Sequence, residues 1–377
     1  MKFYRDVILP SGLLSGTIIG AGVFALPFIF KNSGFITGFL YLVIFAGIFS
    51  IIYLMHADTI IKTPGLHNYV GYARLYLGKE GFYLALLSAV IAMLLSLVVY
   101  LVLSISFLNL IFGGGGVVYK ILVFWIIGSL CVFLKVKAVA LSETLITGAM
   151  VLIIGLVFIL GLGGISENTF VNVNVISPAF IFLPFGPVLF SLAGRSAIPS
   201  LVEYFKKTGQ KFEKIKTPII IGTLLPTLVY TLFVVGVFGL SNQVSSDAVT
   251  GMKEIVSPPL MAIIGILGLL AIISSYIMIG QNVRDIFEED LKVKTWWANG
   301  IVILLPLVLY IIGFQNFLQI IALTGGIFLA LDSILVVLIW WRSRRRYGSA
   351  LLKKLSPTLG YVLIIAFLIG AISEVIY

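Results

Sequence analysis

The sequence predicts an all-α integral membrane protein with about eleven transmembrane helices. Composition is the first reason: of 377 residues, 60% are hydrophobic and 11% are charged, and the mean hydropathy is +1.16. A soluble domain is roughly half apolar and about a quarter charged, and it needs a charged shell over its core. The second reason is that apolar runs recur along the whole chain, unlike one removable targeting segment near Met1. Lipid is therefore the solvent that this composition suits.

The apolar stretches approach or exceed the roughly 20 helical residues that cross the hydrocarbon core of a bilayer. Gly, Pro, Asn and charged residues separate them, as in Lys31-Asn32-Ser33-Gly34 between the first two. We expect spans at residues 7–30, 34–60, 82–112, 118–134, 139–163, 179–203, 216–240, 258–283, 297–314, 316–341 and 356–376.

The distribution of Lys and Arg is the third reason, and it predicts the orientation. If the N-terminus is cytoplasmic, the expected outer segments hold only Lys31, Lys120 and Lys253, and the inner segments hold the other basic residues apart from Arg195. By the positive-inside rule the N-terminus is cytoplasmic and, with an odd number of spans, the C-terminus lies outside. We expect a multi-pass protein of the plasma membrane, the inner membrane of a bacterial cell. Basic loops of this kind also explain the net charge of +10 without nucleic acid as a partner.

A hexapeptide that occurs twice indicates an internal repeat. Residues 22–27 and 194–199 both read Gly-x-x-Ala-aliphatic-Pro. They lie in the first and sixth spans, which cross the membrane in opposite directions, as in an inverted five-plus-five repeat. We expect a first repeat over residues 1–163, a second over 164–346, and an additional C-terminal helix in 347–377.

The prolines that close the two hexapeptides predict broken helices. Pro27 and Pro199 lack an N–H and clash with the carbonyl four residues earlier, so we expect breaks at residues 20–23 and 191–196, near mid-membrane. Unpaired backbone is tolerated in a membrane only where it lines a cavity or binds a ligand. The N–H groups that start the following half-helix favour an anion such as a carboxylate.

Close helix packing is the alternative explanation of the small residues in the first span. Gly12, Gly16 and Gly20 are spaced by four, a pattern that also lets helices approach closely. Paired breaks in corresponding spans of two inverted halves favour a binding site instead.

The stretches around both hexapeptides resemble the first and sixth spans of amino-acid permeases. Residues 16–27 (GTIIGAGVFALP) and 187–204 (PVLFSLAGRSAIPSLVEY) carry the resemblance. The nearest groups in this amino acid-polyamine-cation superfamily are the aromatic amino acid permeases (tryptophan and tyrosine permeases) and the amino acid/auxin permeases. The resemblance implies a LeuT-like fold with discontinuous helices 1 and 6, and an amino acid:cation symporter that works by alternating access. One departure is Arg195, where the aromatic permeases typically have His.

The resemblance also implies a substrate site between the breaks. The carboxylate of an amino acid would lie against the N–H groups of residues 20–22, and carbonyls of residues 191–193 would accept its ammonium group. Hydroxyls near the breaks could contact the ligand or bond to their own helix, and aromatic side chains could close over it or serve as packing. The expected substrate-binding set is Thr17, Gly20, Ala21, Gly22, Tyr100, Phe190, Ser191, Leu192, Ala193, Gly194 and Ser196.

Two charges placed inside spans, Arg195 and Asp332, are a further candidate pair. They fall at comparable depth in the sixth and tenth spans, so an ion pair between them is expected. Its role is gating or proton coupling, or a purely structural lock between helices.

The coupling cation is sodium or a proton. Ser274 and Ser275 lie in the middle of the eighth span, where hydroxyls together with carbonyls of the first span would suit Na⁺, although serine pairs also join helices. Proton coupling would use titratable groups such as Asp332, His56, Asp58 and Glu143, of which His56 and Asp58 are expected at the membrane interface.

Other classes of function lack residues to support them. The spans contain no clustered His-Glu metal motif, Ser-His-Asp set or cysteine nucleophile, and Cys131 is the only cysteine. A Walker-type loop is absent. We therefore expect no enzyme and no cofactor beyond a co-transported H⁺ or Na⁺. The expected partners are an amino acid, aromatic or otherwise neutral, and the lipid bilayer, with the protein a monomer. A non-transporting amino-acid sensor on the same fold stays the alternative.

Overall fold

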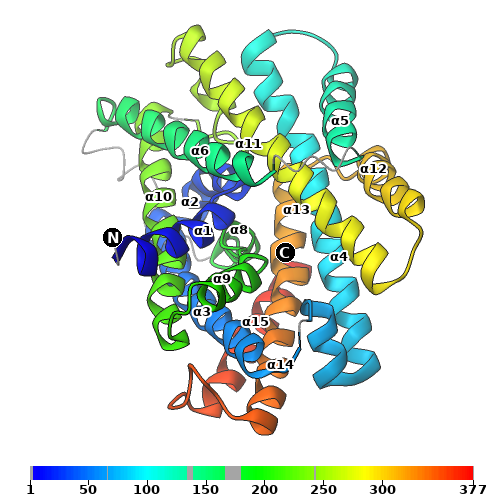
Figure 1. The fold of residues 1–377 in the computed structure, drawn as a ribbon. Coiled ribbons are helices and arrows are strands. Elements are labelled where there is room, and N and C mark those ends of the chain that lie inside the picture. The colour runs from blue at the N-terminus through cyan, green and yellow to red at the C-terminus, as the bar shows by residue number, and fades with distance from the viewer. Residues whose placement is uncertain (1–2, 66, 134–138, 166–179, 242, 377) are drawn as a thin grey trace.

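The described part of the computed structural model covers residues 3–65, 67–133, 139–165, 180–241 and 243–376, without the side chains of 139–146. Within these ranges the chain forms helices and turns and no β-strand. In Figure 1 the short helices α1, α8 and α9 lie in the middle of the bundle, between α10 on one side and α4, α11 and α13 on the other.

Long apolar helices make up most of the structure. Six are long and apolar enough to span a membrane singly, and a seventh span is a pair of helices that bends by 54° at its break. The bounds, in which η marks 3₁₀ or π turns, are η1 (Tyr4–Ile8), α1 (Leu9–Ile18), η2 (Ala21–Ala25), α2 (Leu26–Ser33), α3 (Phe35–Lys62), α4 (Tyr69–Phe112), α5 (Val117–Phe133), α6 (Val139–Leu162), α8 (Phe185–Ser191), α9 (Ala197–Lys207), η4 (Phe212–Ile215), α10 (Lys216–Leu240), η5 (Thr250–Met252), α11 (Pro258–Asp285), η6 (Ile286–Asp290), α12 (Thr295–Ile311), α13 (Phe317–Leu323), η7 (Thr324–Leu329), α14 (Ala330–Tyr347) and α15 (Pro357–Ile376).

Each predicted span contains a helix or a broken helix, so the all-α membrane architecture is confirmed. Helix α4 extends beyond the predicted span 82–112, because it begins at Tyr69 and is interrupted by a kink at Gly78, where φ is +79°. The repeat boundaries at 163/164 and 346/347 stay predictions, and the first borders on residues outside the described part.

The break in the first broken helix begins earlier in the sequence than predicted. Helix α1 ends at Ile18, and Ile19 and Gly20 are extended, whereas residues 20–23 were expected to form the break. The chain then forms the 3₁₀ turn η2 before α2, which carries Pro27 in its first turn, where the missing N–H costs nothing. Proline therefore starts the second half-helix, and Gly20 takes up the change of direction.

The second broken helix follows the prediction closely. Helix α8 ends at Ser191 and α9 begins at Ala197, so residues 192–196 are not helical. Pro199 again lies in the first turn of the second half-helix. Both predicted discontinuities are thus present in spans 1 and 6.

Candidate functional site

Two glycines allow the broken segments to touch each other. A Cβ on Gly22 would lie 2.6 Å from Ser191 Cα, and a Cβ on Gly194 would lie 2.4 Å from Cγ1 of Ile18. Each break therefore packs directly on the other, and each contact uses the first glycine of a repeated hexapeptide. The sequence indicates that these glycines weaken a helix. The structure adds that neither position has room for a side chain of its own, because the opposite break fills the space.

Two buried tyrosines bond the peptide groups that the breaks expose, and sequence reasoning missed both. The Tyr53 hydroxyl of α3 donates to the Leu192 carbonyl and accepts from the Gly194 N–H, each at 2.6 Å. The Tyr230 hydroxyl of α10 lies 2.7 Å from the carbonyl of Ile18 and 2.9 Å from that of Ser191, so it bridges the two breaks. Each break is thereby tied to a long helix beside it.

A cavity of about 990 Å³ opens where the breaks meet. It extends toward the end of the bundle that carries the N-terminus, where Tyr4, Ile8 and Tyr204 line it, and Tyr4 and Ile8 are exposed there. On the opposite side, Phe24 is fully buried and packs edge-on against Phe107 and Phe233, with centroids 5.1 and 5.6 Å away. The cavity is therefore closed on that side and reaches the surface at the N-terminal end.

Most of the expected substrate-binding residues line this cavity, and two do not. Ser191 and Leu192 are buried behind it, and their carbonyls, expected to be free for an ammonium group, accept from tyrosine hydroxyls instead. This part of the expectation needs correction, because the sequence does not reveal which helix covers a break. Those that line it are Thr17, Gly20, Ala21, Gly22, Tyr100, Phe190, Ala193, Gly194 and Ser196.

Several candidate hydroxyls bond to their own helices, as the alternative explanation expected. Thr17 donates to the Leu13 carbonyl at 3.0 Å, and Ser191 donates to the Pro187 carbonyl at 2.7 Å. Ser275 donates to the Ala271 carbonyl at 3.1 Å. Ser274 and Ser275 nevertheless line the same cavity as residues 18–20.

The expected ion pair is present in the cavity wall. Nη2 of Arg195 lies 2.8 Å from Oδ2 of Asp332, and Asp332 is almost fully buried. The other carboxylate oxygen accepts from the hydroxyls of Tyr69, at 3.1 Å, and Ser88, at 2.5 Å. The guanidinium also stacks over the Tyr69 ring, 3.5 Å from its centroid. The pair joins the second break to α14, and Tyr69 and Ser88 were not anticipated from the sequence.

The other titratable candidates do not reach the cavity. His56 and Asp58 are buried, His56 against Tyr69 and Tyr72 of α4 and Asp58 against the turn after α14, and their place at the membrane interface stays a prediction. The Asp58 carboxylate accepts from Trp340 Nε1, the Ser349 hydroxyl and the N–H groups of residues 350 and 351, so it anchors that turn. The side chain of Glu143 lies outside the described residues.

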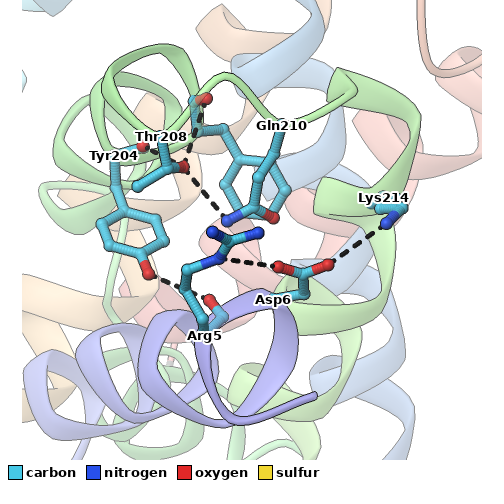
Figure 2. Close-up of polar contacts among 7 residues, drawn as sticks. Arg5, Asp6, Tyr204, Thr208, Gln210 and Lys214 are labelled. Carbon is cyan, nitrogen blue, oxygen red and sulfur yellow. Dashed lines mark hydrogen bonds and ion pairs between the residues drawn. The ribbon is translucent and has the colours of Figure 1, made fainter. Parts of the chain in front are cut away.

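Polar contacts join η1, at the start of the first broken helix, to the end of α9 and to η4, as Figure 2 shows. The Asp6 carboxylate pairs with Arg5 at 3.2 Å and with Lys214 of η4 at 3.1 Å. Tyr204 of α9 donates to the Arg5 carbonyl at 3.0 Å. The start of the first broken helix is thus fixed to α9 and to the turn that follows it.

Comparison with known proteins agrees with this geometry. A model of the tryptophan/tyrosine permease family matches residues 5–376. A tryptophan-specific transport protein of Shigella flexneri is 26% identical over an alignment of 248 residues that covers 60% of this chain and 56% of that protein. The chain therefore matches little more than half of that relative's length.

Solved structures share the fold at low sequence identity. MhsT, crystallised with L-phenylalanine, superposes with a TM-score of 0.73 at 16% identity, covering 97% of this chain and 98% of its own. The Eremococcus coleocola manganese transporter gives 0.68 at 14% identity over 96% and 84%. Mhp1, a nucleobase-cation-symport-1 family transporter, gives 0.60 at 14% identity over 97% and 91%. These likenesses confirm the LeuT-like fold, and the match over nearly the whole length shows that the chain belongs to the tryptophan/tyrosine permease family.

Proposed function

We propose that this protein is a secondary active transporter, an amino acid:cation symporter that works by alternating access on aromatic or other neutral amino acids. The observation that carries the proposal is the meeting of two broken helices, Gly22 against Ser191 and Gly194 against Ile18, beside one cavity. The family and the names of its relatives support the substrate class, since one relative is tryptophan-specific and MhsT was crystallised with L-phenylalanine.

Substrate binding would use the backbone of the first break. A helix leaves the N–H groups of its first residues without partners inside the helix, and Ala21 and Gly22, which line the cavity, open η2. The substrate carboxylate would bind there, with its ammonium group toward Ala193, since the neighbouring carbonyls are bonded to tyrosines. Phe49, Ile52 and Met93 line the same cavity and offer apolar surface to the side chain of the substrate.

The cycle would begin from the state described above, with the cavity open at the N-terminal end. The positive-inside distribution supports a cytoplasmic position for this end and an outer position for the C-terminus, and the proposed transporter is a monomer in the plasma membrane. Release to the cytoplasm would follow the wall formed by Tyr4, Ile8 and Tyr204. The coupled cation is H⁺ or Na⁺, and Na⁺ would use the hydroxyls of Ser274 and Ser275 with carbonyls of α1. No cofactor takes part.

Uptake into sealed vesicles tests this function. Purified protein reconstituted into liposomes should accumulate labelled L-tryptophan or L-phenylalanine when a proton or sodium gradient, acid or sodium-rich outside, is imposed. Running the two gradients separately identifies the cation. Binding without accumulation under either gradient would contradict transport and favour the amino-acid sensor.

A further inference from the structure

Glu374 is a carboxylate inside the last span that neither the substrate site nor the ion pair uses. It lies in α15, partly buried, against two glycines of other helices. A Cβ on Gly326 of η7 would lie 2.6 Å from Oε2 of Glu374, and a Cβ on Gly186 of α8 would lie 2.9 Å from the same oxygen. The carboxylate therefore occupies space that exists because both neighbours are glycine.

No cation balances this carboxylate within the described residues. Their ion pairs, taken to 4.0 Å, include none with Glu374. An ionised carboxylate without a partner is costly where it is buried, and a proton removes that cost.

The titratable groups around Glu374 are few. Tyr41 of α3 is near enough to interact with it electrostatically, and α8, α13 and η7 carry no titratable side chain. On α15 itself, the titratable Tyr361, which packs against Trp341 of α14, lies roughly 20 Å from Glu374 at a rise of 1.5 Å per residue. The remaining titratable groups of α3 and α14 lie farther along those helices: Tyr53, His56, Asp58, Lys62, Asp332, Arg342, Arg344, Arg345, Arg346 and Tyr347.

Glu374 also packs against the helix that leads to the substrate site. Its Oε2 lies beside Gly186, in the first turn of α8, since a Cβ on that glycine would lie 2.9 Å from the oxygen. The backbones of α8 and η7 are in contact here, since a Cβ on Gly325 would lie 1.9 Å from the Gly186 carbonyl. Helix α8 is 7 residues long, and its other end, Ser191, touches Gly22 at the first break. A change at Glu374 therefore acts on one end of a short rigid helix whose other end forms the site.

We propose that Glu374 is a proton-binding site of the transport cycle. The ionised carboxylate and its neutral acid, formed when a proton binds from the outer side, pack differently against the start of α8, and the neutral acid lets α8 move with the substrate. The inference rests on the proposed function and deepens it by naming a residue that binds the coupled proton.

The Glu374→Gln variant tests the inference in proteoliposomes. Gln keeps the shape of the side chain and cannot take up a proton. We expect this variant to exchange internal for external labelled amino acid without any gradient, and to lose accumulation driven by an acid exterior. Glu254→Gln is the matched control, because Glu254 is an exposed outer carboxylate, and it should accumulate like the wild type.

Glu374→Asp keeps the titratable group and guards against a folding defect in the Gln variant. It should retain pH-driven accumulation. Wild-type accumulation in Glu374→Gln would overturn the inference, and so would loss of exchange in both variants, since that result makes Glu374 a structural residue. A wild-type protein that neither exchanges nor accumulates any amino acid would instead contradict the proposed function.

Discussion

Gly22 and Gly194 hold the two breaks in contact, so a single methyl group should disturb the site. In Gly22→Ala the new Cβ would lie 2.6 Å from the Ser191 backbone, which cannot yield as a flexible side chain can. We expect overpacking of about 1–3 kcal/mol and loss of most amino-acid uptake. Gly12→Ala, in the same span with nothing within 4 Å of its new Cβ, is the control and should keep uptake. Equal uptake by both variants would mean that the breaks are not in contact.

The hydroxyl of Tyr53 should matter more than its ring. Tyr53→Phe leaves the Leu192 carbonyl and the Gly194 N–H unpaired in a buried place, at about 1–3 kcal/mol for each group. We expect a lower melting temperature and weaker apparent affinity for substrate, measured by thermal unfolding and uptake kinetics. Tyr83→Phe, on an exposed tyrosine of α4, should change neither.

At this scale the sequence identifies part of the site. Glycine and proline stand out because they act on the local backbone, so both hexapeptides were recognised. The chain has 16 tyrosines, and no local pattern marks Tyr53 or Tyr230, whose backbone partners lie up to 212 residues away. Glu374 was missed because it lies near the end of its span, where a charge needs no explanation from sequence alone.

The Arg195–Asp332 pair joins the second break to α14, so its removal should affect how these two elements are held together. Asp332→Asn leaves the guanidinium without its counter-charge, which costs at most about 3–5 kcal/mol for a buried pair. We expect uptake to be lost or uncoupled from the ion gradient. Ser88→Ala removes one hydrogen bond to Asp332 but no charge, so its effect should be smaller. Uptake with unaltered rate and pH dependence in Asp332→Asn would count against a role of the pair in transport.

Contacts at the N-terminal end should keep η1 fixed to α9 and η4. Asp6→Asn weakens the links to Arg5 and Lys214, and we expect η1 to loosen. A cysteine placed at Ile8 in a Cys131→Ser background should then react severalfold faster with a thiol reagent. Glu203→Gln is the control, because it removes an exposed pair with Lys207. Equal labelling rates in the two variants would show that the contacts do not hold η1.

The ends of the helices could be predicted from the sequence where a proline fixes them. Pro27 and Pro199 both start half-helices, so the second break was placed within one residue, whereas the first begins at Ile19 because Ala21 to Ala25 form a 3₁₀ turn. The segment before residue 82 has mixed polarity and was not taken as a span, and α4 runs through it with a kink at Gly78.

For the whole molecule, composition and span length were sufficient to predict an all-α membrane protein. The paired hexapeptides were sufficient to predict the inverted repeat. Which helices surround the site was beyond reach, because spans that are apolar on all sides carry little amphipathic signal. The cavity, the tyrosine bridges and the side on which the cavity opens are properties of the packed bundle.

A structure of the protein with L-tryptophan bound tests the central claim most directly. We predict the ligand in the cavity between the breaks, with its carboxylate within hydrogen-bonding distance of the N–H groups of Ala21 and Gly22. A ligand bound elsewhere, or continuous helices through residues 18–22 and 191–197 in that complex, would contradict the account.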